Sequence, residues 1–134
     1  MKRITCESGL TLIEITVTIG VVAFTMLAVL FANTQIQKMT EAAFERSVAL
    51  QDANQVLEQM RNTARIGTFP TNVTTAFPNN GNIAGFNSLA GQQIVVTYVN
   101  PAVDPLDTTV TVSWQENGIR PVNTALRTLV TRRV

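Results

Sequence analysis

The stretch Ser8-Gly9-Leu10-Thr11-Leu12-Ile13-Glu14 joins a short basic leader to a long apolar run that ends at Ala32. From Leu10 the run has about 23 residues, enough to cross a hydrocarbon layer of about 30 Å as a helix. A cleavable secretory signal has a shorter apolar core and a small-x-small site, and neither feature is present. The sequence therefore predicts a transmembrane helix, which constrains the fold more than any other segment.

The basic residues of the leader predict the orientation of this helix. Lys2 and Arg3 precede the apolar run, and only Lys38 follows it closely. Cytoplasmic flanks carry the excess of Lys and Arg, so we expect a cytoplasmic N-terminus and an extracytoplasmic C-terminal part.

Glu14 is the single charged residue of the apolar run. A charged side chain near the membrane interior costs about 2.5–3.5 kcal/mol on insertion scales. One interpretation is that Glu14 lies among the lipid headgroups and is solvated. The other is that the carboxylate has a function, which would also give a role to the small residue Gly9 five positions before it.

The composition excludes several classes of function. The chain has 134 residues, 46% of them hydrophobic, and a formal net charge of +1, which suits one modest domain with no bias towards nucleic acid. Histidine is absent and the single cysteine, Cys6, lies in the leader. These counts leave no intrachain disulfide and no thiolate metal cluster. No catalytic constellation can be named, so we expect no enzyme activity, no metal and no cofactor.

The basic leader, Gly9, the Thr-Leu-Ile-Glu stretch and the apolar helix together resemble the class III signal of type IV pilins and type II secretion pseudopilins. The resemblance implies cleavage by a prepilin peptidase between Gly9 and Leu10, N-methylation of Leu10, and a role for Glu14 as the assembly carboxylate. Leu10 departs from the usual phenylalanine, and the apolar segment lacks the proline that the family often has.

The resemblance also implies the partners and the location of the chain. Partners would be other pilins or pseudopilins through the N-terminal helix, the peptidase/N-methyltransferase, the assembly platform of the inner membrane and the lipid bilayer. The chain would start as a single-pass protein of the bacterial inner membrane and then enter a pilus or pseudopilus. The alternative is an uncleaved, signal-anchored membrane protein with an extracytoplasmic binding head.

Residues 33–66 are expected to continue the helix as an amphipathic half. The segment has no proline or glycine, and Gly67 and Pro70 predict its end. The whole helix, residues 10–66, would be about 85 Å long. Apolar residues at three- and four-residue spacing predict one buried stripe: Met39, Ala43, Leu50, Ala53, Leu57, Met60 and Ala64.

Residues 67–134 are expected to form a β head. A loop over 67–91 is anchored by aromatic side chains (Phe69, Phe77 and Phe86). Strands are predicted over 93–99, 108–116 and 124–132, with Asn117-Gly118 as a tight turn. The resulting fold class is α+β, with a long helix and an antiparallel sheet of three to four strands. The resemblance implies that this is a type IV pilin fold with residues 1–9 as leader. The Val110–Trp114 strand resembles the heads of V-class minor pilins and I-type minor pseudopilins.

Three features of the head allow a second interpretation. We favour a core position for Trp114 over a ligand platform. We favour turn chemistry over a calcium site for Asp104 and Asp107. Three arginines near the C-terminus would suit DNA, but a solvated strand end is the favoured interpretation: Arg127, Arg132 and Arg133.

Overall fold

A computed structural model describes residues 11–132 and contains one long helix, one short helix and three strands. The long helix, α1, spans Leu12–Ala64. Two compact units divide between Met39 and Thr40 within α1. The predicted continuation of the apolar helix into a second half is therefore confirmed, with the helix ending two residues before the expected limit.

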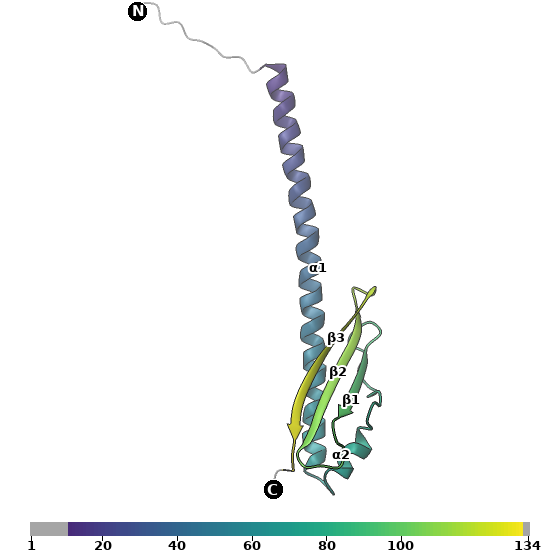
Figure 1. The fold of residues 1–134 in the computed structure, drawn as a ribbon. Helices are drawn as coiled ribbons and strands as arrows, with labels where there is room; N and C mark the ends of the chain where they lie inside the picture. The colour runs from purple at the N-terminus through teal and green to yellow at the C-terminus, as the bar shows by residue number, and fades with distance from the viewer. Residues whose placement is uncertain (1–10, 133–134) are drawn as a thin grey trace, which may run out of the picture. The chain divides into compact units, whose positions relative to one another are not determined.

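The second unit has α1 residues from Thr40 onward, the short helix α2 (Thr71–Ala76) and an antiparallel sheet (Figure 1). The sheet is a meander in the order β1-β2-β3, made of β1 (Gln93–Tyr98), β2 (Leu106–Glu116) and β3 (Arg120–Val130). The layout is α+β, and the sheet has the lower of the two expected strand numbers. The predicted loop over 67–91 contains the short helix α2.

Alternation along β2 fixes which face of the sheet is buried. Val110, Val112 and Trp114 lie on the buried face, while Thr109 and Thr111 lie on the opposite, half-exposed face. A period of two is what a strand with one covered face requires. Trp114 is 2% exposed, so the prediction of a core tryptophan is confirmed.

The helix covers this face with a row that differs from the predicted stripe. Ala53, Leu57, Met60 and Ala64 are buried as expected, but the other three predicted members are exposed: Met39, Ala43 and Leu50. That part of the prediction is wrong. The buried row instead begins at Ala49 and continues through Asp52 and Val56. Each residue turns a helix by about 100°, so the added residues lie to one side of the four shared ones, while Met39 and Ala43 come before the row begins.

The aromatic residues of the 67–91 loop hold it against the core, as predicted. Phe77 is 7% exposed, and Phe69 and Phe86 are partly buried against the core cluster. A second anchor is polar: the buried Asp52 carboxylate accepts a 2.7 Å hydrogen bond from Gln92 Nε2. The Gln92 side-chain oxygen in turn accepts from the backbone N–H groups of Ser88 and Leu89.

The end of α1 is closed by backbone conformation and by one side chain. Gly67 has φ +85°, a left-handed conformation that glycine adopts without steric cost, so the predicted helix stop is confirmed. Asn72 Nδ2 donates to the carbonyl oxygen of Thr63, which also accepts from the Ile66 N–H, and to the carbonyl oxygen of Ile66 just after the helix end.

The loop also closes the outer edge of β1. Backbone and side-chain groups of residues 79–83 take the hydrogen-bonding positions that a further strand would fill. The Asn80 N–H donates to Val96 O and the Ile83 N–H donates to Ile94 O, both at 2.8 Å. The Ile94 N–H donates to Asn82 Oδ1 at 3.2 Å, and the Tyr98 N–H donates to Asn79 Oδ1 at 3.1 Å.

We predict that Met60→Ala lowers the free energy of unfolding by about 2–5 kcal/mol, because truncating a fully buried methionine leaves a cavity. The matched control is Met39→Ala on the same helix, where the side chain is 70% exposed. It should change stability by less than about 0.5 kcal/mol. Denaturant titration of the full chain in detergent, followed by Trp114 fluorescence, measures both. Equal losses in the two variants would contradict the observed packing of α1.

Candidate functional site

Glu14 lies in the first turn of α1, and its backbone is held by Thr11. The Glu14 N–H donates to the Thr11 carbonyl at 3.0 Å and makes a weaker 3.4 Å contact with the Thr11 hydroxyl. Thr11-x-x-Glu14 also has the spacing of a capping box, in which the N-terminal hydroxyl and the later carboxylate exchange hydrogen bonds. An anion here interacts favourably with the free N–H groups and dipole of the helix start.

The side chains that follow Glu14 form an exposed apolar surface. Every described residue from Thr11 to Glu41 is exposed. The most apolar window of α1 has a mean hydropathy of 2.4, and none of it is buried within the described chain. By length and composition, α1 is the one helix of the described residues that could cross a membrane. This surface needs a cover from lipid or from other helices, because apolar area exposed to water is costly.

The threonines of this segment do not interrupt its apolar character. Thr16 and Thr18 donate their hydroxyls to the carbonyls four residues earlier, at 2.5 and 2.6 Å. Thr25 and Thr34 donate to carbonyls three residues earlier, each at 2.8 Å. A hydroxyl bonded within its own helix needs no partner from the surroundings, which makes it compatible with a hydrocarbon environment.

Of the three predicted site residues, the structure places only Glu14. Gly9 and Leu10 lie outside the described residues, so the predicted cleavage and methylation site remains a prediction. The next acidic residue along α1 after Glu14 is Glu41, 27 residues later. The carboxylate is thus a single acidic group at the start of an otherwise apolar surface.

Glu45 is a second carboxylate with a defined role, and the sequence did not indicate it. Its side chain accepts from Trp114 Nε1 at 3.1 Å and from the Asn117 N–H at 3.2 Å. One residue of α1 thereby holds both the core tryptophan and the turn between β2 and β3. The signal was its spacing: Glu45 stands four residues before Ala49 and so lies on the same side of the helix as the buried row.

The two aspartates considered for calcium have other partners. Asp107 accepts two hydrogen bonds from Arg127, at 2.9 and 2.5 Å, and Asp104 accepts one from the Thr131 hydroxyl at 2.9 Å. Within residues 11–132, no cluster of three or more acidic, His or Cys side chains could hold a metal ion. The hydrogen bonds from Arg127 hold the pKa of the Asp107 carboxyl below its ordinary value.

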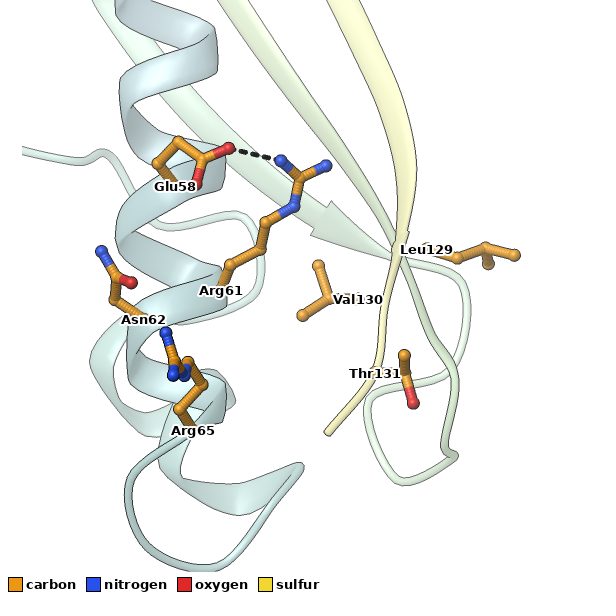
Figure 2. A pocket seen from close by; sticks show the side chains of 7 residues that line it. All are labelled: Glu58, Arg61, Asn62, Arg65, Leu129, Val130 and Thr131. Atoms are coloured by element: carbon orange, nitrogen blue, oxygen red, sulfur yellow. Dashed lines mark hydrogen bonds and ion pairs between the residues drawn. The ribbon is translucent and has the colours of Figure 1, made fainter. Parts of the chain in front are cut away.

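The arginines near the C-terminus do not act as one patch in the described chain. Arg127 is paired with Asp107 on the outer face of the sheet. Arg132 is exposed after the end of β3, and Arg133 lies outside the described residues. A cleft of about 480 Å³ opens nearby between the end of α1 and the end of β3 (Figure 2), and it is lined by Glu58, Arg61, Asn62, Arg65, Leu129, Val130 and Thr131. Glu58 and Arg61 form an ion pair, as their spacing predicts.

Comparison with known proteins found no matching family model, no matching curated protein and no matching solved structure.

We predict that Asp107→Asn makes stability less dependent on pH in the acid range. The pKa of Asp107 is lower in the folded than in the unfolded chain, where it is about 3.9. The pair therefore stabilises the fold fully above that value, and its contribution is lost as pH falls through the folded pKa. Denaturation midpoints of both proteins between pH 2 and 6 should differ most at pH 6 and converge at low pH. A constant difference would show that the charge of Asp107 is not the cause.

Proposed function

We propose that the chain is a structural subunit of a membrane-derived filament: a minor pilin or pseudopilin with a type IV pilin fold. The observation that carries the proposal is the exposed apolar surface of α1 before Asn33, preceded by a single carboxylate in its first turn. Within the second unit, the sheet packs on residues 49–64 of α1. Lipid covers the exposed apolar surface in the free subunit, and the same segments of neighbouring subunits cover it in the filament.

The processing step gives Glu14 its partner. Cleavage between Gly9 and Leu10 creates an α-amino cation at Leu10, and the cation of an incoming subunit pairs with Glu14 of a neighbour. Opposite charges attract strongly where water is excluded, but the pairing is favourable only with good geometry. The residue that is costly in lipid thus sets the docking position between subunits.

The proposal assigns a place to each part of the chain. The leader is cytoplasmic and is removed by the peptidase/N-methyltransferase. The apolar segment lies in the inner membrane until an assembly platform transfers it to the filament. The head is periplasmic or extracellular, held together by its core, by the Asp52–Gln92 bond and by the Glu45 contacts.

We predict that the mature N-terminus is N-methylated Leu10. Mass spectrometry of the protein from its native host should show this residue first, and Gly9→Val should leave the leader in place because the peptidase needs a small residue at the cut. A wild-type protein that retains its leader would contradict the proposal. That result would favour a signal-anchored membrane protein with a binding head.

We predict that Glu14→Ala and Glu14→Gln are both processed normally but enter filaments about tenfold less, or lower still. Removing one partner of a buried ion pair leaves the other unpaired, which costs more than the 1.4 kcal/mol that a tenfold change represents. Glu14→Gln retains a capping-box residue and loses only the charge. The matched control is Glu41→Ala, an exposed position of α1 outside the apolar segment. Normal incorporation of Glu14→Gln, measured in sheared filament fractions, would rule out the charge pairing.

A further inference from the structure

The two edges of the sheet are treated differently. Residues 79–83 satisfy the outer edge of β1, as described above. In the part of the chain that the structure describes, no segment pairs with the outer edge of β3. A long unpaired edge is a template for another strand, and proteins usually cover or interrupt it.

The register shows which groups of β3 face outwards. Gln115, the partner of Pro121, donates its N–H to Ala90 O on the β1 side. Antiparallel pairs alternate between bonded and non-bonded, so every second residue of β3 directs its N–H and C=O away from β2. Pro121 occupies the first such position, where its lack of an N–H costs no bond within the sheet. The four positions after it keep both groups: Asn123, Ala125, Arg127 and Leu129.

Most side chains on the inner face of β3 are less buried than those on the inner face of β2. The inner residues of β2 from Leu106 to Trp114 are buried, whereas Val122 and Leu126 of β3 are only partly buried against the core. Leu50 of α1 is 38% exposed. It precedes Leu57 and Arg61 by seven and eleven residues, which places the three on one side of the helix. A strand added beyond β3 would bring its inward side chains to this half-covered strip.

The end of this strip is positively charged. Arg61 of α1 and Arg65, the first residue after α1, line the cleft beside Leu129, Val130 and Thr131 (Figure 2). Glu58 pairs with Arg61 and offsets one charge, which leaves Arg65 without an ion-pair partner among the described residues. Arg127 forms an ion pair with Asp107 on the other face of the sheet, which offsets its charge. The excess positive charge beside β3 therefore lies at the cleft.

We propose that the outer edge of β3, from Asn123 to Leu129, and the adjoining cleft form a docking groove for an extended segment of another protein chain. The segment pairs its backbone with the four outward positions and places an acidic side chain against Arg61 and Arg65. Outward groups that recur every second residue, about 6.6–6.8 Å apart, match an extended strand and not a helix. The charged end selects for acidic residues at one end of the segment.

The β3 groove belongs to the second unit alone and uses neither Leu10 nor Glu14. It goes beyond the proposed function and does not depend on it. A failure of the groove in the test below would leave filament assembly untouched, and unprocessed protein would still bind through the groove.

The test uses the full chain in detergent micelles and a designed acetylated probe, Ser-Val-Thr-Val-Thr-Asp-Asp. The probe should bind saturably and should slow amide hydrogen exchange at the four outward positions of β3. The amides of β3 that already donate to β2 should show little change in exchange rate. A probe ending in Lys-Lys should bind at least tenfold more weakly, and added salt should reduce this difference because it screens the charges.

Two changes test the backbone pairing separately. Ala125→Pro removes one outward N–H and should weaken binding at least tenfold, while Ala125→Val keeps the N–H and should bind within twofold of the wild type. Denaturation followed by Trp114 fluorescence checks the fold of each variant. If the proline variant fails to fold, a probe with N-methylated alternate amides tests the same pairing on the unchanged protein.

The proposal is overturned if the acidic probe does not bind, or if protection appears away from the four outward amides. It is also overturned if the folded Ala125→Pro variant, or the N-methylated probe, binds as well as its unmodified counterpart. Charge reversal of Arg61 and Arg65 to Glu should invert the preference between the acidic and basic probes. An unchanged preference would remove the assignment of the cleft to an acidic side chain.

Discussion

One helix in two surroundings is the constraint on which the rest of the structure depends. The first part of α1 exposes apolar side chains to whatever surrounds it, and the part from Ala49 to Ala64 buries a row against the sheet. Burial of apolar area is worth about 25 cal/mol per Å², so an uncovered helix of this length is unfavourable in water. None of the most apolar window of α1 is buried within the described chain.

Much of the architecture could be predicted because single residues carry strong local signals. Alternating Val110, Val112 and Trp114 predicted the central strand and its buried face. Gly67 and Pro70 predicted the end of the helix, and Asn117-Gly118 predicted the turn between β2 and β3. Each of these three signals depends on local backbone conformation or on the alternation of side chains along a strand. None of them requires knowledge of contacts between distant residues.

The rotation of α1 against the sheet could not be predicted in the same way. The helix is rich in alanine, so two neighbouring sides have similar hydrophobicity, and the sequence pattern favoured the side with Met39 and Leu50. Asp52 and Glu45 decide the other side, because each bonds to a group far away in the sequence: Gln92, Trp114 and Asn117. Polar residues in a buried row weaken the apolar pattern of the sequence, although their hydrogen bonds help to fix the rotation of the helix. The processing site is a different case, since Gly9 and Leu10 lie outside the described residues and their assignment comes from the resemblance.

The meander order of the sheet has a consequence for how the head reaches its native state. Each strand pairs with its neighbour in the chain, and β2 and β3 are joined by a three-residue connection, Asn117–Ile119. Contacts between segments close in sequence cost little loop entropy and form quickly. The strands can therefore pair in the order in which they follow one another along the chain. Packing of the three-strand sheet on α1 joins segments that lie further apart in the sequence, so we expect it to be the slower step.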